Sequence, residues 1–249
     1  SVFERDAHKL RMELLQCVPL TDSVKLSRLR LTNDSSSSRT LTVTYYAEWV
    51  LGTTRAATAP FVTTAIDEQT RAMFARNPWR TQSGEQVAFA DMGGQQTSWT
   101  GDRREFLGPY GRLAAPRALI AQTALSNRTG AGLDPCCALQ AVVTIEPGGS
   151  AELVIMLGSA PNAGEAQSLI TRYRTRSIDD VLGDRWRHAA RARGIWARTS
   201  RSPRLCTPAA ARAGRVVCAS RRELECLAAR RGAKIEHALA AHVAEQLRR

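Results

Sequence analysis

The chain has 249 residues and a formal net charge of +12. This length is sufficient for one large β-domain or for two smaller domains with a buried core. No run of about 18 or more apolar residues occurs, so the sequence excludes a membrane-spanning helix. No secretory signal is visible, and we therefore expect a cytoplasmic protein. Because the chain begins with Ser1 rather than Met, we expect it to be part of a longer protein.

The positive charge is concentrated at the C-terminal end. Residues 184–249 carry 15 Arg and one Lys against five acidic residues, whereas residues 1–183 carry 19 basic and 18 acidic residues. Such an asymmetry indicates two segments with different physical properties. We therefore expect a charge-balanced body and a basic tail.

The body alternates short apolar segments with polar turns. Residues 24–31 alternate apolar and polar side chains with period two, and residues 40–51 are rich in Thr, Val, Tyr and Trp. These two segments predict a hairpin of strands. Residues 52–59 are small and polar, so we expect a loop there. The sequence predicts strands at residues 10–18, 24–31, 40–51, 61–66, 71–76, 87–91, 95–100, 139–145 and 151–157. Short strands at this spacing are typical of a β-sandwich.

Helical patterns follow the strands. Residues 163–173 carry apolar side chains at helical spacing, and we expect residues 178–186 to continue as helix. Because the predicted strands come first and the helices follow, the sequence excludes a parallel sheet built from βαβ units. In the tail, residues 223–230 and 233–247 have good helix propensity but a mostly Ala apolar face, so we expect loose helices or disorder. The expected organisation is a β-sandwich at 1–160, a helical linker at 161–197 and an Arg/Ala-rich tail at 198–249.

Residues 96–108 concentrate hydrogen-bonding groups beside an aromatic ring. Sugar recognition needs a flat apolar face for the pyranose and bidentate polar groups for its hydroxyls. The candidate substrate-binding residues of this segment are Trp99, Asp102, Arg103, Arg104 and Glu105. The alternative is a strand-end loop in which Asp102 and one Arg only fix the turn. We expect Phe106 and Leu107 to pack in the core in either case.

The carboxylates of Asp102 and Glu105 are not expected to form a glycosidase pair. Such pairs act across a bound glycosidic bond with carboxyls about 5–9 Å apart, and residues of one short loop rarely span a sugar in this way. Tyr46 and Glu48 share one face of their strand. Trp79 follows the turn at residues 76–78, where it is either a packing lid, which we favour, or a sugar platform.

The Cys and His residues do not predict a metal site. The six Cys lack a regular disulfide spacing, so we expect free, buried thiols. Cys218 and Cys226 are separated by seven residues, unlike zinc-finger ligands, and His237 and His242 lie on a segment without a core. The Arg-rich tail could neutralise phosphates. It lacks interleaved aromatic residues, so we expect non-specific polyanion binding and no specific nucleic-acid partner.

The body contains several motifs that together carry a family resemblance. They are RLRLTNDSS, TLTVTYYAEWVLG, ARNPW, VAFADMGG, TSWTGDRREFLG, GAGLDPCCALQ and LGSA, and they span about residues 11–175. On these motifs the chain resembles glycoside hydrolase family 94, the glycoside phosphorylases formerly called glycosyltransferase family 36. Within that family it is most similar to the phosphorylase-like region of cyclic β-1,2-glucan synthases.

The resemblance implies a galactose-mutarotase-like β-supersandwich, followed in the family by a helical linker and an (α/α) barrel. It implies work on β-glucans with inorganic phosphate as co-substrate, a possible homodimer, and membrane attachment only through other parts of a longer protein. It also implies that the loop at 99–108 faces the substrate cleft and brings an Arg to sugar or phosphate. The family's general acid is an Asp of the barrel, so we expect no catalytic residue in this chain and no activity of the chain alone.

The resemblance ends near Gly183, where the sequence turns to Arg, Ala, Pro, Ser and Cys. One hypothesis is that the tail is a frameshifted end rather than an evolved domain. The alternatives to a carbohydrate-binding module are a structural fragment without activity and a nucleic-acid binder that acts through the basic tail.

Overall fold

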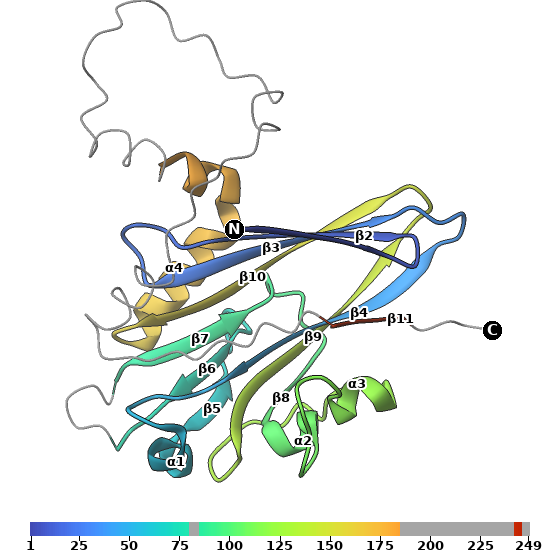
Figure 1. Cartoon of the computed structure of the whole chain (residues 1–249). Coiled ribbons are helices and arrows are strands. Elements are labelled where there is room, and N and C mark those ends of the chain that lie inside the picture. Colours follow the sequence, from blue (N-terminus) through green and yellow to red (C-terminus); the bar gives the residue numbers. More distant parts are fainter. Residues whose placement is uncertain (80–84, 185–241, 246–249) are drawn as a thin grey trace, which may run out of the picture.

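The fold is a sandwich of two antiparallel β-sheets, seen in a computed structural model that describes residues 1–79, 85–184 and 242–245 (Figure 1). The larger sheet has the strand order β1-β2-β3-β10-β7-β6-β5, and the smaller has the order β11-β4-β9-β8. The strands are β1 (Val2–Ala7), β2 (Leu10–Cys17), β3 (Val24–Asn33), β4 (Arg39–Glu48), β5 (Thr63–Ile66), β6 (Met73–Arg76), β7 (Val87–Asp91), β8 (Ser98–Asp102), β9 (Pro135–Ile145), β10 (Ser150–Ala160) and β11 (His242–Glu245). The helices are α1 (Arg55–Thr58), the 3-10 turn η1 (Ala59–Phe61), α2 (Arg103–Leu107), α3 (Arg117–Ala121) and α4 (Ala163–Thr175).

The main core lies between the two sheets. Alternate side chains of β3, β10, β7 and β6 meet those of β4 and β9 in one buried cluster. Leu31, Leu41, Leu139 and Leu153 are completely excluded from solvent there. The period-two pattern of the sequence produces this layer, because every second residue of a strand points to the same face.

Helix α4 covers the outer face of the larger sheet. Its buried residues Ala166, Ile170 and Tyr173 pack on Phe89 and other side chains of that face. Residues 178–184 are also helical and extend this cover. Asn162 caps α4, since its side chain accepts a hydrogen bond from the Glu165 backbone N–H at 2.9 Å.

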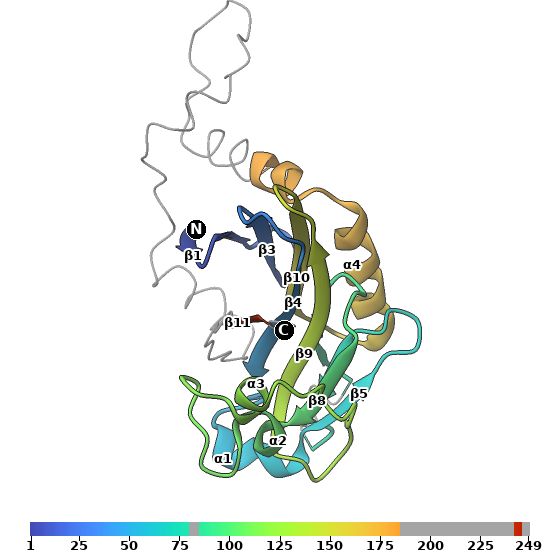
Figure 2. The same ribbon diagram turned by 90° about the vertical axis from the view of Figure 1, so that its right-hand side faces the viewer.

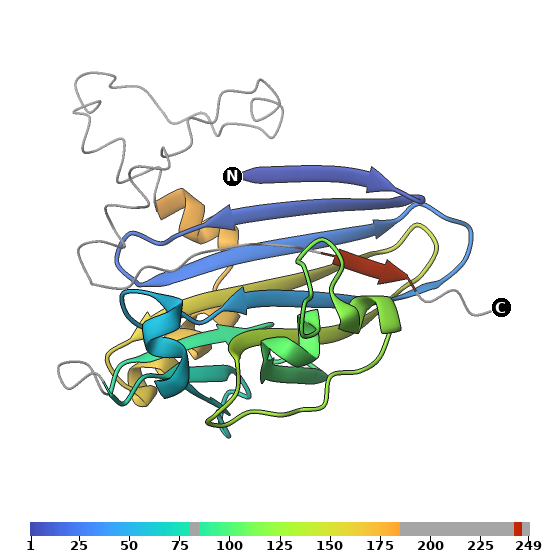
Figure 3. The same ribbon diagram turned by 60° about the horizontal axis from the view of Figure 1, so that its bottom comes forward.

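Helices α2 and α3 cover the outer face of the smaller sheet, on the side opposite to α4 (Figure 2). Phe106, Leu107 and Leu119 pack there on Tyr46 and Cys136. Both short helices and α1 lie on the same side of the molecule (Figure 3). The face that carries these helices is therefore built on β4, β9 and β8.

A buried ion pair joins α4 to the end of β7. The Asp91 side chain has no solvent exposure and accepts hydrogen bonds from Arg174 Nε at 3.0 Å and Nη2 at 2.7 Å. It also accepts from the backbone N–H groups of Gly93 at 3.0 Å and Gly94 at 3.1 Å, both of which have positive φ. The turn that follows β7 is thus closed by one carboxylate and one guanidinium from a distant helix.

The mainly β fold class predicted from the sequence is confirmed, and the expected strands and the helix at 163–173 are present. The loop expected at 52–59 is wrong in part, because Thr54 caps the short helix α1 by accepting from the Ala57 N–H. Strand β1 was not predicted; it pairs with β2 through a turn at His8 and Lys9, which both have positive φ without being Gly.

The remaining expectations concern the C-terminal tail. The helix expected at 233–247 is wrong at residues 242–245, which form β11 and pair with the open edge of β4. Backbone pairing at the open edge of β4 outweighs the helix propensity of a segment whose mostly Ala apolar face can bury little surface. Cys218, Cys226 and His237, which were not expected to bind a metal, lie outside the described residues, as do the helix expected at 223–230 and most of the tail. Among the residues described, no helix is long and apolar enough to cross a membrane.

Candidate functional site

The segment predicted to bind sugar forms the junction of β8 and α2. A register irregularity between Thr100 and Asp102 shifts the pairing of β8 with β9, and Asp102 opposite Pro135 is the last pair. Asp102 then caps α2, because its Oδ1 accepts a hydrogen bond from the Arg104 N–H at 3.0 Å. Gly108 ends the helix with a φ of 90°, a conformation that favours Gly. The segment is therefore an ordered strand-to-helix connection.

Arg103 belongs to a network of two arginines and two carboxylates. Its Nε donates to Glu48 Oε1 at 2.9 Å, and its Nη1 lies 3.8 Å from Asp134 Oδ2. Arg55 contacts the same two carboxylates, with Nη1 3.5 Å from Glu48 Oε2 and Nη2 on Asp134 Oδ1. Each of the four side chains is about one quarter exposed. The two positive and two negative charges balance, so the network holds the start of α2 in place. It leaves neither guanidinium without a carboxylate partner.

Tyr46 connects the network to the apolar layer beneath it. Its hydroxyl donates to Glu48 Oε1 at 2.9 Å, and its ring stacks on Phe106 with centroids 4.7 Å apart. Burial disfavours the Glu48 carboxylate, but the hydrogen bonds from Arg103 and Tyr46 outweigh burial and lower the pKa of Glu48. The hydrogen bond to Glu48 raises the pKa of Arg103. Both side chains are therefore held in their charged forms.

Glu105 is also held by neighbours. Its Oε2 accepts from Thr100 Oγ1 at 2.6 Å and from Ser126 Oγ at 2.7 Å, and its Oε1 accepts from the Ser126 N–H at 2.8 Å. Its carboxylate ties α2 to the segment before β9. Because Asp102 is used as the helix cap, both carboxylates of the loop have structural partners.

Trp99 lies on the other face of β8 from Thr100 and packs partly buried against the core between the sheets. The guanidinium of Arg71 lies 5.9 Å from the centroid of its ring. Trp99 is thus separated from the side chains that surround Arg103 and Glu105, and Arg71 lies over its ring. The structure does not bring the aromatic ring and the α2 side chains of the predicted site together.

Arg104 differs from the other four candidates. Its side chain is exposed, and no hydrogen bond or ion pair engages it within the part of the chain that the structure describes. Nearby, Arg128 is 62% exposed and lies 3.8 Å from Asp102. The candidate site therefore consists of a short helix that presents the Arg104 side chain to solvent.

Glu48, Arg55, Asp134 and Ser126 were not identified from the sequence. Their charged or hydrogen-bonding partners in the site lie 7 to 79 residues away in the chain, and no local spacing marks them. The GAGLDPCCALQ motif includes Asp134 but gives no partner for it. Within residues 1–79, 85–184 and 242–245, no group of three or more His, Cys, Asp or Glu side chains could hold a metal ion.

The cysteine side chains of the body are apolar core residues. Cys17, Cys136 and Cys137 are buried thiols, as the sequence predicted for them. Burial raises the pKa of the Cys136 and Cys137 thiols. Neither is therefore a reactive thiolate at neutral pH.

Comparison with known proteins identifies the family. Residues 1–176 match the family described as "Glycosyl hydrolase 94, supersandwich domain". The chain belongs to this family. The curated relative "Cyclic beta-(1,2)-glucan synthase NdvB" from Rhizobium meliloti (strain 1021) is 36% identical over 174 residues, which are 70% of this chain and 6% of the relative. This supersandwich domain thus spans a small part of that relative.

Among solved structures, the chain "Putative kojibiose phosphorylase from human microbiome" matches with a TM-score of 0.42 and 7% sequence identity. The match covers 73% of the supersandwich chain and 21% of the solved chain.

Proposed function

We propose that this supersandwich domain is a non-catalytic, glucan-contacting part of a larger β-glucan synthase or glycoside phosphorylase. Support comes from the family match over residues 1–176 and from the relative that is named a cyclic β-1,2-glucan synthase. The chain spans only 6% of that relative. A catalytic domain elsewhere in a longer protein would then supply the chemistry.

The observation that carries this proposal is the way in which α2 presents Arg104. Arg103 and Glu105, its neighbours in the chain, are fixed by Glu48 and Ser126, while the Arg104 side chain is exposed and unengaged within the described part. A guanidinium offers several N–H donors in a planar arrangement that suits sugar hydroxyls or phosphate. Because the helix is already ordered, binding would cost little conformational entropy in the backbone.

The same geometry favours a binding role over catalysis. A general acid needs a carboxyl that can release its proton to the glycosidic oxygen. The Glu105 carboxylate accepts three hydrogen bonds from neighbours, and Asp102 caps the helix. Neither carboxylate is available for that task.

The test is a titration of the isotopically labelled chain with a linear β-1,2-linked glucose oligosaccharide, followed by NMR. We expect shifts of the residues around α2 and about a tenfold or larger loss of affinity in Arg104→Ala, because one hydrogen bond to a charged group contributes about 1.5 kcal/mol or more. Arg5→Ala, which removes an exposed Arg from β1, is the matched control. Equal affinities of the wild type and Arg104→Ala would contradict the role of α2, and no shift at any millimolar concentration would contradict glucan binding by the domain.

A further inference from the structure

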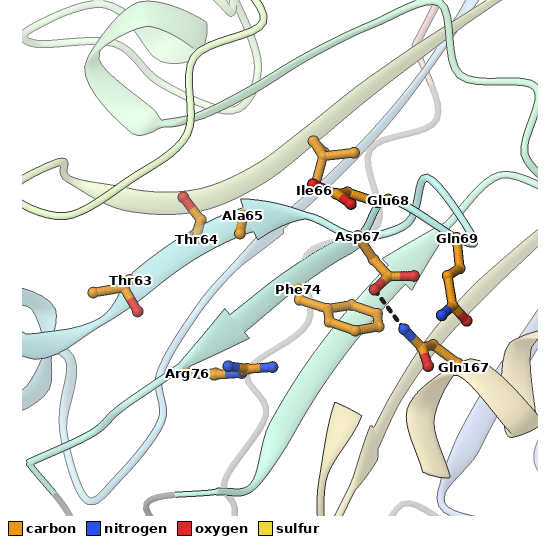
Figure 4. Close-up of a pocket in the computed structure, with 10 residues that line it drawn as sticks. All are labelled: Thr63, Thr64, Ala65, Ile66, Asp67, Glu68, Gln69, Phe74, Arg76 and Gln167. Carbon is orange, nitrogen blue, oxygen red and sulfur yellow. Dashed lines mark hydrogen bonds between the residues drawn. The ribbon is translucent and has the colours of Figure 1, made fainter. Parts of the chain in front are cut away.

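A pocket of about 350 Å³ lies at β5, the outermost strand of the larger sheet, next to α4 (Figure 4). Strands β5 and β6 form one side of it, and Gln167 of α4 forms part of another side. Phe74, which is 4% exposed, contributes apolar surface to the lining. The pocket therefore combines an apolar patch with polar side chains, as sugar sites do.

The polar lining is partly fixed and partly available. Asp67 Oδ1 accepts from Gln167 Nε2 at 2.8 Å, and Asp67 Oδ2 accepts from Thr70 Oγ1 at 2.7 Å. The side chains of Glu68 and Arg76 are exposed, and neither has a hydrogen bond or ion pair within the described part of the chain. These two side chains can therefore turn to the hydroxyls of a ligand.

A pair of stacked aromatic rings flanks the β5–β6 hairpin, one just before β5 and the other just after β6. The rings of Phe61 and Trp79 stack with centroids 4.9 Å apart and an angle of 14° between planes, and Trp79 is 72% exposed. Asn77 fixes the turn before Trp79: its Oδ1 accepts from the Trp79 N–H at 3.2 Å, and its Nδ2 donates to the Leu51 carbonyl at 2.8 Å. An indole held in place with an open face is suited to stack on a pyranose ring.

The pocket and the aromatic surface are joined by the strand register. Thr63 and Arg76 both line the pocket and form the last pair of the β5–β6 ladder. Phe61 ends the 3-10 turn η1 two residues before Thr63, and Trp79 follows Arg76 by three residues. The stacked rings therefore belong to the end of the β5–β6 hairpin at which Thr63 and Arg76 line the pocket.

We propose that this edge surface, defined by Phe61, Trp79, Arg76, Glu68 and Gln167, is a second binding site that takes a linear gluco-oligosaccharide. Trp79 stacks on one pyranose, and Arg76 and Glu68 bind hydroxyls of the next units. The choice of a glucan rests on the proposed function, but the site itself is independent of α2. Its role is to hold a second stretch of the glucan on the face of the larger sheet that α4 covers.

The experiment uses the full chain and a linear β-1,2-linked glucose tetrasaccharide, with the indole N–H signal of Trp79 and the signals of residues 63–69 as reporters. We expect these signals to shift on titration, and we expect Trp79→Ala to weaken binding at this site about tenfold. Trp79→Phe should restore part of that loss. Tyr110→Ala removes another exposed aromatic ring, since Tyr110 is 96% exposed, and should leave the affinity unchanged.

The outcomes separate this inference from the proposed function. Shifts confined to α2, with no shift at residues 63–69, overturn the edge surface and leave the α2 proposal standing. Shifts at residues 63–69 that Trp79→Ala abolishes and Arg104→Ala does not alter support the edge surface independently of α2. Equal affinities of Trp79→Ala and the wild type at this site overturn the inference, provided that thermal unfolding shows both chains folded.

Discussion

Replacing Arg174 by Ala should destabilise the domain far more than an ordinary surface mutation on the same helix. The Asp91 carboxylate has no solvent exposure and would lose two charge-assisted hydrogen bonds, while the Thr70 carbonyl would lose the bond from Arg174 Nη2. Removing one partner of a buried ion pair costs about 3–5 kcal/mol. Three hydrogen bonds to Asp91, from Gly93, Gly94 and Gln96, would remain. We therefore expect a loss near the lower limit, about 3 kcal/mol.

Thermal unfolding followed by circular dichroism measures this effect. For a domain of this size, about 3 kcal/mol corresponds to a fall in Tm of about 6–12 °C. Arg172→Ala is the matched control, because Arg172 is 54% exposed and pairs with Asp22 at 3.1 Å on the same helix. Such an exposed pair contributes about 0–1 kcal/mol. If both variants lose the same stability, the pair with Asp91 does not anchor α4 and the reasoning is refuted.

Two further predictions concern pH and close packing. The folded pKa of Glu48 lies below its ordinary value of 4.5, so its stabilising contribution is complete above that pH and is lost as the pH falls through the folded pKa. Urea unfolding at a series of pH values should therefore show that the free energy of unfolding falls less steeply with acid in Glu48→Gln than in the wild type. Identical slopes of the two chains would contradict this prediction. Gly158→Ala would place a Cβ 2.5 Å from the Phe89 ring and should cost about 1–3 kcal/mol in urea unfolding, whereas Gly164→Ala, with its nearest atom at 3.5 Å, should be nearly neutral.

The fold was predictable because its layers follow local patterns. Alternation in residues 24–31 and 40–51 gives β3 and β4 and their buried face, and helical spacing gives the buried stripe of α4. Strand β1 escaped prediction because its turn at His8 and Lys9 lacks the Gly or Asn that usually marks such a hairpin. The short helix α1 escaped because four residues give no period to detect.

The candidate site was predictable only as a segment. The sequence places Trp99 and Arg103 four residues apart, but the strand ends at Asp102 and a helix begins at Arg103. Side-chain direction follows a period of two in the strand and 3.6 in the helix. Trp99 therefore points toward the core between the sheets, whereas Arg103 lies beside Glu48 on the outer face. Residues distant in the sequence, such as Glu48 and Ser126, engage Arg103 and Glu105 and leave Arg104 exposed. The spacing of residues within the segment cannot predict these contacts.

Neighbouring residues of α2 have different roles, because Arg103 and Phe106 hold the helix in place while Arg104 is exposed. Glu48 and Asp134 fix Arg103, and Phe106 anchors the helix by stacking on Tyr46. The helix position therefore does not depend on the side chain of Arg104, which contributes no described contact to the fold. A residue in this situation can change its chemistry without unfolding its support. We accordingly expect the core and the ion pairs of the supersandwich to stay the same when the side chain at position 104 is replaced.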